Sequence, residues 1–356
     1  MSDNPKEAEK EMEKAIFIAA DCWLGVFDLL PRFQLGFEIA MISHRFDRRV
    51  DEHFKTRKWT LEHIVIQRKI GQNGAKEMEI VNSDWEALPI PQNPLPNKVI
   101  GFRSIWIYFI DQNVITFLGR FDRFFANCAT NLTITTVNVH ILEFIVLNIW
   151  PMFKDTIYLL SLDIVAFRQI RQLAPSLLND CPSLHIVAFQ GSIFPAFPPD
   201  DSANASDGQA LTKWLFTPRH DNFMKELRFY MNSAVEEEQW SAIVEQIKAS
   251  FSAASSPVSF GISVLIPPFS SLSAVVPFEL TNELTGEKLA LSKEDEEADL
   301  SGFSIIRCPI VPDDKRQQQM NKELGDRWNR IDFFIGDDGV GDGLLDAASA
   351  GPSDDH

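Results

Sequence analysis

Two short apolar helices are predicted for residues 16–54, the first part of the chain with regular hydrophobic spacing. Apolar residues recur there at intervals of one, three and four, as on one face of a helix: Trp23, Leu24, Phe27 and Leu30. Pro31 is expected to end this helix. A second set with the same spacing follows it: Leu35, Ile39, Ile42 and Phe46. A hairpin of this length cannot cover all its large apolar side chains, so some are expected to meet another surface.

Residues 99–335 alternate short apolar strands with amphipathic helices. The strands begin near residues 104, 131, 156 and 184, a spacing that suits the repeats of a leucine-rich solenoid or successive βα units. A solenoid binds partners on the concave face of its strands, whereas a doubly wound sheet binds them at the carboxyl ends of its strands. We favour the irregular, leucine-rich-repeat-like curve because Cys181-Pro-Ser-Leu precedes a strand as such turns do, and because no phosphate-binding glycine motif follows any strand. The sequence does not decide between the solenoid and the open-sheet arrangement of the βα units.

The carboxyl-terminal part of this region contains further strands. Residues 194–211, rich in Pro, Asp, Ser and Gly, are predicted to be a surface loop. Two alternating runs around Thr285-Gly286 predict a β-hairpin over residues 276–291. The expected elements after it are a strand at 303–310, an amphipathic helix at 313–328 and a last strand at 330–336.

The fold class predicted is therefore α+β or α/β, with five parts along the chain. They are a disordered leader at 1–14, a three-helix module at 15–58, a connector with a proline-rich linker at 59–98, a βα-repeat recognition domain at 99–335 that ends in a hairpin-containing region, and an acidic flexible tail at 336–356. Four prolines between Leu88 and Pro96 exclude a helix or a central strand there. We interpret this stretch as a linker or an edge segment. A stiff linker of this kind suits a receptor that holds its cargo at a set distance.

Composition and charge exclude several classes of function. The formal net charge of −17 argues against general nucleic-acid binding, because proteins bind the phosphate backbone through surfaces rich in Lys and Arg. No signal peptide is evident and no apolar run is long enough for a transmembrane segment, so we expect a soluble protein of the cytoplasm, the nucleus or both, without a membrane partner. The four cysteines are isolated in apolar contexts, which favours buried thiols.

Catalytic and ligand-binding motifs are also lacking in the sequence. The Asp- and Gly-rich segment 336–346 does not have the ligand order of an EF-hand. The histidines do not form a zinc-binding pair at helical spacing, and no serine lies in a Gly-x-Ser-x-Gly turn. We therefore expect no cofactor, no metal and no catalytic residue, and an enzyme is the weakest of the functional classes.

Residues 16–54 resemble an F-box, the helical module through which substrate receptors dock onto the Skp-type adaptor of cullin-RING ubiquitin ligases. The residues that match the family pattern are Ile18, Asp21, Trp23, Leu24, Val26, Phe27, Leu30, Pro31, Leu35, Ile42, Ser43, Arg45 and Phe46. Ala19 occupies the position of the opening proline. Gly25 lies inside the first predicted helix, where it costs about 1 kcal/mol relative to Ala.

Longer blocks of the chain are similar to a large nematode family of F-box-like proteins. They lie at 94–102, 176–184, 205–219, 276–289, 307–310 and 328–347, so the resemblance covers about residues 16–352. It implies an amino-terminal module that docks an adaptor and a carboxyl-terminal recognition domain of the F-box-associated type.

The function that this resemblance implies is that of a non-catalytic substrate receptor of a Skp–cullin–F-box-type ubiquitin ligase. Its partners would be a Skp-type adaptor, a cullin reached through that adaptor, and a protein substrate. The residues expected to bind the adaptor are Ile18, Trp23, Leu24, Phe27, Leu30, Pro31 and Leu35. The alternative is an autonomous interaction or scaffold protein, whose degenerate F-box packs on its own chain and no longer docks an adaptor.

Overall fold

The structure is a computed structural model of the 356-residue chain. It describes residues 19–30, 34–54, 59–70, 76–81, 87–90, 99–125, 129–191, 193–221, 223–230, 237–266, 276–295, 301–310, 329–336 and 339–340. The chain divides into two compact units. The first comprises Met1–Leu61 and Pro91–Ile100, and the second comprises Glu62–Ile90 and Gly101–His356.

The first unit contains the helical module. Its helical segments are α2 (Ala20–Phe27), the π-helix η1 (Leu35–Ile39), α4 (Ala40–Ile42) and α5 (His44–His53). Ser43 separates α4 from α5 because its backbone is extended, with φ −167° and ψ 161°, and its Oγ accepts a hydrogen bond from the Phe46 N–H at 3.4 Å. This serine N-cap explains why the second predicted helix is broken, since its side chain satisfies a backbone donor at the start of α5.

The described strands form one mixed sheet of 13 strands in the order β10-β11-β12-β9-β8-β7-β6-β5-β13-β4-β1-β2-β3. Their bounds are β1 (Trp59–Ile70), β2 (Lys76–Val81), β3 (Ala87–Pro89), β4 (Val99–Ile107), β5 (Thr130–Ile134), β6 (Ile157–Asp163), β7 (Ile186–Gln190), β8 (Lys225–Tyr230), β9 (Phe260–Ile266), β10 (Phe278–Asn282), β11 (Glu287–Asp295), β12 (Ser301–Pro309) and β13 (Asn329–Phe333). The fold is thus mixed α/β, as predicted, and its strands form a large mixed sheet.

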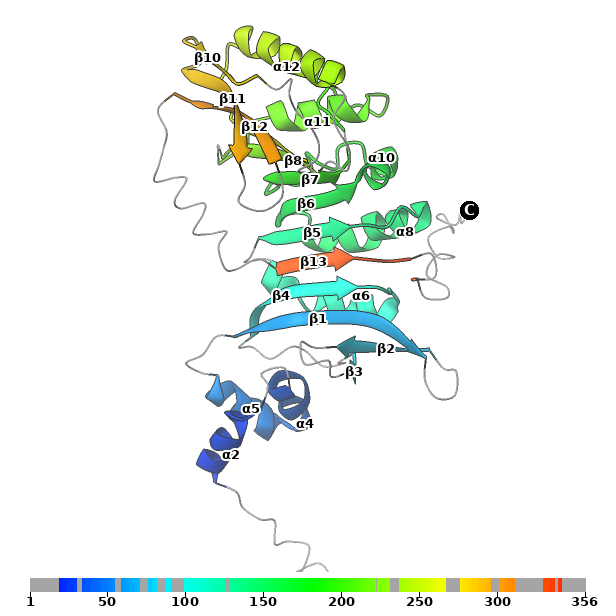
Figure 1. The fold of residues 1–356 in the computed structure, drawn as a ribbon. Helices are drawn as coiled ribbons and strands as arrows, with labels where there is room; N and C mark the ends of the chain where they lie inside the picture. The colour runs from blue at the N-terminus through cyan, green and yellow to red at the C-terminus, as the bar shows by residue number, and fades with distance from the viewer. Residues whose placement is uncertain are drawn as a thin grey trace, which may run out of the picture. The chain divides into compact units, whose positions relative to one another are not determined.

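The centre of the sheet is parallel. Strands β5 to β9 lie side by side in the same order as along the chain and pair in parallel. Strand β13, far along the chain, lies between β4 and β5 and is parallel to both (Figure 1). Antiparallel strands complete both ends of the sheet. From β5 to β9 the strand order follows the chain without reversing. A doubly wound sheet, by contrast, contains a point where the strand order reverses.

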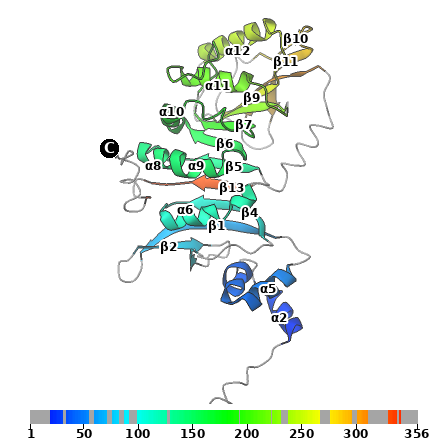
Figure 2. The same ribbon diagram turned by 180° about the vertical axis from the view of Figure 1, so that it is seen from behind.

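Helices pack against one face of this sheet. They are α6 (Gln112–Gly119), α7 (Asp122–Phe125), α8 (Val139–Phe144), the π-helix η2 (Ile145–Ile149), α9 (Trp150–Phe153), α10 (Ile164–Leu173), α11 (Asp207–Phe216) and α12 (Glu237–Ser252). Figures 1 and 2 show α6, α8 and α10 on the same side of the strands. Among the described helices, none is both long and apolar enough to cross a bilayer.

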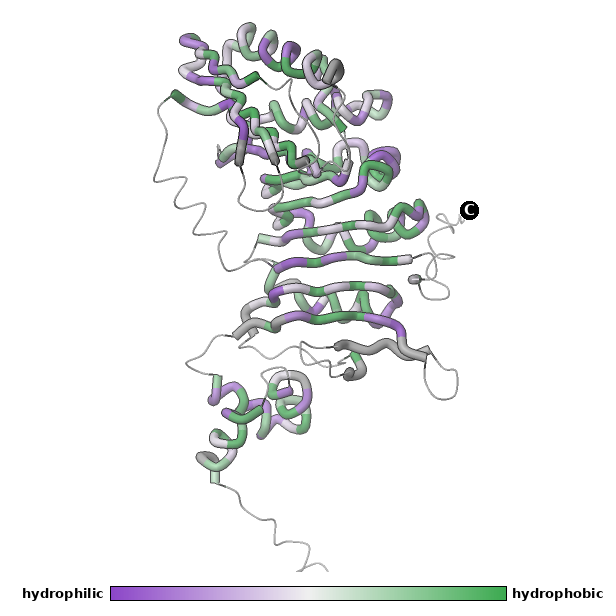
Figure 3. Tube along the Cα trace, viewed as in Figure 1, coloured by the Kyte–Doolittle hydropathy of each residue, from purple (hydrophilic) through white to green (hydrophobic). Residues whose placement is uncertain are grey.

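Aromatic side chains connect these helices to the sheet. The Phe167 ring on α10 lies 5.1 Å from the Phe189 ring on β7, and the Trp240 ring on α12 lies 4.5 Å from the Phe303 ring on β12, measured between centroids. Since side chains alternate between the two faces of a strand, every second residue is left for the opposite face. Figure 3 shows the resulting mixture of hydrophobic and hydrophilic positions along the strands. The apolar core therefore lies between the helices and one face of the sheet.

Two predicted segments contain more regular structure than a connector or a loop. Residues 59–98, predicted as a connector, include β1, β2 and β3, and β3 lies at an edge of the sheet. The predicted loop at 194–211 ends at Ser206, where α11 begins with a capping box formed by Ser206 and Gln209. The predicted helix at 313–328 and most of the predicted tail at 336–356 lie outside the described residues.

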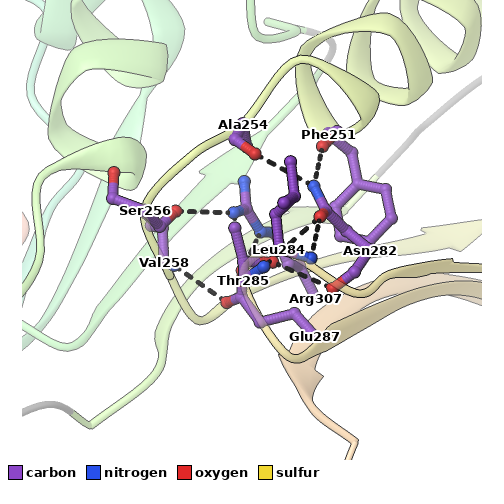
Figure 4. A network of polar contacts seen from close by, with 9 residues as sticks. All are labelled: Phe251, Ala254, Ser256, Val258, Asn282, Leu284, Thr285, Glu287 and Arg307. Carbon is purple, nitrogen blue, oxygen red and sulfur yellow. Dashed lines mark hydrogen bonds and ion pairs between the residues drawn. The ribbon is translucent and has the colours of Figure 1, made fainter.

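The predicted hairpin is present as β10 and β11, and its turn is fixed by buried polar contacts (Figure 4). Gly286 has a φ of +67°, which glycine adopts without strain. The Asn282 Nδ2 donates to the carbonyl oxygens of Phe251 at 2.9 Å and Ala254 at 3.1 Å, at the end of α12. These bonds attach the turn to carbonyl groups at the helix end, where intrahelical donors run out.

A fully buried ion pair lies beside this turn. Glu287 and Arg307 are each only 1 % exposed. Arg307 Nε and Nη2 donate to Glu287 Oε2 at 3.1 and 2.6 Å, and Nη2 also donates to the Ser256 carbonyl at 3.1 Å. Glu287 Oε1 accepts from the Val258 N–H at 2.8 Å. The pair therefore joins β11, β12 and the segment that follows α12.

Candidate functional site

The helical module has an aromatic interior of its own. The Trp23 and Phe46 rings meet edge to face with centroids 4.9 Å apart, and the Phe27 and His53 rings meet in the same way at 5.7 Å. Phe27 is 1 % exposed. These contacts pack α2 against α5, so the module has an interior that does not depend on another protein.

Apolar side chains nevertheless remain on the surface of this module. Leu29 is 84 % exposed, Ile42 is 62 % exposed, and Val26 is also exposed. We call these three residues the exposed apolar set. Leu29 lies just beyond the end of α2, and Ile42 ends α4 before the extended Ser43. Within the described part of the chain, these side chains form apolar surface that is exposed to solvent. A docking partner can bury this surface.

The residues predicted to bind the adaptor are distributed differently. Trp23, Leu24 and Leu30 are half-buried, while Phe27 and Leu35 are buried in the module. Ile18 and Pro31 lie outside the described residues. Sequence reasoning did not select Leu29, although it belongs to the same apolar run and precedes the proline. Helical spacing identified which residues share a face, but not which neighbour covers them.

A second surface is the sheet face opposite the helices. At β4 and β13 it carries three aromatic rings in contact: Trp106, Tyr108 and Phe334. The Phe334 ring stacks on Tyr108 with centroids 5.4 Å apart and meets Trp106 edge to face at 6.2 Å. Trp106 and Tyr108 are exposed. Aromatic rings of this kind provide large contact area at low conformational cost.

Two ion pairs on this face each form within a single strand. On β8, Arg228 Nε donates to Glu226 Oε1 at 2.7 Å, and Ser263 Oγ donates to the same oxygen at 3.2 Å. Although burial alone would lower the pKa of Arg228, the Glu226 carboxylate raises it. On β13, Arg330 Nε lies 2.7 Å from Asp332 Oδ2. The face thus carries aromatic side chains and these two ion pairs.

Buried titratable groups collect where β6, β7 and β8 begin. Burial, and secondarily the nearby Arg219, lowers the pKa of His185 to about 4 and that of Lys225 to about 8. Burial opposes ionisation of Asp221, but hydrogen bonds from Arg219 outweigh it and lower the pKa of Asp221 to about 2. Lys225 Nζ donates to the Trp214 carbonyl at 2.7 Å. These partners belong to the fold itself, which indicates a structural role for the cluster.

One serine–histidine contact bears on the enzyme alternative. Ser104 Oγ lies 2.5 Å from His63 Nδ1, the distance of a nucleophile from its base. Ser104 is buried, so its hydroxyl is not open to a substrate. Within the described ranges, no three His, Cys, Asp or Glu residues are grouped so that they could hold a metal ion.

Comparisons with known proteins add no relative from which a function can be transferred. No family model matches the chain, and neither a curated protein nor a solved structure matches it significantly.

Proposed function

We propose that this protein is a substrate receptor of a Skp–cullin–F-box-type ubiquitin ligase. In this proposal the helical module docks a Skp-type adaptor, and the sheet domain binds a protein substrate. The receptor itself carries out no chemistry, because ubiquitin is transferred by a partner enzyme.

The observation that carries the proposal is the exposed apolar set on a module that already has a core. Burying a leucine or isoleucine stabilises a complex by about 1.5 to 3 kcal/mol before the costs of association. Leu29 and Ile42 alone therefore offer a partner several kcal/mol of apolar burial. The resemblance of residues 16–54 to an F-box gives the class of partner, a Skp-type adaptor.

The substrate is proposed to bind the open face of a leucine-rich-repeat-like domain. Two observations support this part of the proposal: strands β5 to β9 follow one another in chain order, and all the described helices that pack on them lie on one face. Repeats of that kind leave the other face of the strands for recognition. Here that face carries Trp106, Tyr108 and Tyr230, all exposed.

A second candidate is a scaffold protein with an F-box-like module that no longer docks an adaptor. The burial of Phe27 and Leu35 favours it, because these two residues of the resemblance contribute to the interior of the module. Ala19 favours it too, because the F-box pattern has its opening proline at this position. The two candidates differ in whether the exposed apolar set has a partner.

Capture of a purified Skp-type adaptor by the immobilised full chain tests the proposal. Leu29→Asp places a charge in the exposed apolar set without touching the core, and it should weaken capture by at least about tenfold. Leu284→Asp is the matched control, because Leu284 is also 84 % exposed but lies in the hairpin turn. It should capture adaptor like the wild type.

The two candidates then give different results. If the wild-type chain captures no adaptor, the scaffold function replaces the receptor function. If capture occurs but Leu29→Asp leaves it unchanged, the docking face is not the exposed apolar set.

A further inference from the structure

The two edges of the sheet differ in how they are protected. One edge is β3, which has three residues including Pro89 and thus lacks one backbone donor. Short strands and prolines are common ways to block an edge against pairing. The other edge is β10, which has five residues, no proline, and β11 as its one partner among the described strands. We call Phe278–Asn282 the β10 edge.

The β10 edge is held rigidly at both of its ends. At Asn282 the side-chain amide is bound to the last turn of α12, as Figure 4 shows. At Phe278 the ring lies under the ammonium group of Lys248 on α12, with Nζ 4.3 Å from the ring centroid. A strand fixed in advance loses little conformational freedom when another segment pairs with it.

Side chains along the β10 edge alternate between apolar and polar. Phe278 and Leu280 are half-buried, on the side where Lys248 contacts the Phe278 ring, whereas Glu279 and Thr281 are exposed on the other side. Glu283, in the turn that follows, is also exposed. An added strand would therefore meet Phe278 and Leu280 on one face, and the Glu279 carboxylate and Thr281 on the other.

We propose that the β10 edge binds an extended, basic segment of a partner protein as an additional strand. Backbone hydrogen bonds would supply the affinity, as in other cases of strand addition, and alternating side chains the specificity. A segment with Lys or Arg at alternate positions places these opposite Glu279, with apolar residues beside Phe278 and Leu280. The chain's net charge of −17 attracts such a segment and opposes pairing with a second copy of itself.

This inference goes beyond adaptor docking and holds whether or not the helical module binds an adaptor. Its test uses the full chain without adaptor and a fluorescein-labelled peptide that alternates Lys and Val over about eight residues, a strand's length. Fluorescence polarisation should show saturable binding, and hydrogen exchange should slow in residues 278–282 when the peptide is added.

Three matched comparisons decide the result. Glu279→Lys should weaken binding about tenfold, because it replaces an attractive cross-strand pair with a repulsive one. Asp155→Lys, the same charge change in an exposed loop, should leave binding unchanged. A peptide with methylated backbone nitrogens should not bind, because it cannot pair as a strand.

Other outcomes overturn the proposal. Equal binding by the methylated peptide would mean attraction to acidic surface alone. Equal binding by the Glu279→Lys chain, or none by the wild type, would exclude the β10 edge. A dimer of the chain that Glu279→Lys disrupts would show that a second copy occupies this edge instead.

Discussion

Replacing Arg307 with methionine should strongly destabilise the sheet domain. The substitution removes the cation but keeps an apolar chain of similar length, so Glu287 remains 1 % exposed with its Val258 N–H partner and without the two Arg307 donors. Leaving one charge of a buried pair without its partner costs about 3 to 5 kcal/mol. The surrounding packing changes little, so this electrostatic cost dominates.

The assay is urea unfolding followed by far-UV circular dichroism, in which the midpoint shifts while the slope stays constant. Arg168→Met is the control: Arg168 pairs with Asp207 at 3.0 Å, but its side chain is 60 % exposed. Exposed pairs contribute at most about 1 kcal/mol. Arg307→Met should therefore lower the free energy of unfolding several times more than Arg168→Met.

A double-mutant cycle separates the pair from other effects. Glu287→Gln together with Arg307→Met removes both charges, and should cost less than the sum of the two single changes because no unpaired charge stays buried. Equal costs for Arg307→Met and Arg168→Met would refute the reasoning. So would a double variant whose loss equals the sum of the single losses.

Two further predictions concern pH and helix stability. Burial lowers the pKa of His185 from 6.5 to about 4. Between these pH values the unfolded chain binds a proton on this histidine that the folded chain does not bind. Wild-type stability should therefore fall by about 3 kcal/mol as the pH drops from 6.5 to 4. In the His185→Phe variant, the urea midpoint should change less with pH across that range. A pH dependence as steep as that of the wild type would contradict the assignment of this effect to His185. In α2, Gly25→Ala should raise the stability of the module by about 1 kcal/mol, because a β-carbon there meets no atom within 4 Å. Loss of helical circular dichroism signal in this variant would contradict that expectation.

Local patterns predicted most strands of the sheet. The run at 276–291 predicted a hairpin because alternating residues flank Thr285-Gly286, and Gly286 does adopt a positive φ there. The start of α11 was missed although Ser206 and Gln209 have the spacing of a capping box. The surrounding Pro, Asp, Ser and Gly residues concealed that signal.

Long-range pairing could not be predicted from such patterns. Strand β13 lies between β4 and β5, so Ile331 pairs with Ile105 and Leu132, each about two hundred residues away in the chain. Its sequence Asn-Arg-Ile-Asp-Phe alternates polar residues with Ile331 and Phe333, a pattern that suits several positions in a sheet, and nothing in it specifies these neighbours. The same limit applies to the helical module, where burial of Phe27 and exposure of Leu29 depend on how α5 packs.

The buried ion pair and the β10 edge are connected by geometry. A buried ion pair is a weak source of stability compared with apolar packing of the same volume, but it tolerates few alternative arrangements. Glu287 begins β11 directly after the turn, and Arg307 on β12 holds it against the segment behind α12. The pair therefore fixes the position of the hairpin rather than only adding to stability. A strand whose outer edge is to receive another chain needs that fixed position, because a shift of one residue would move Glu279 to the apolar face.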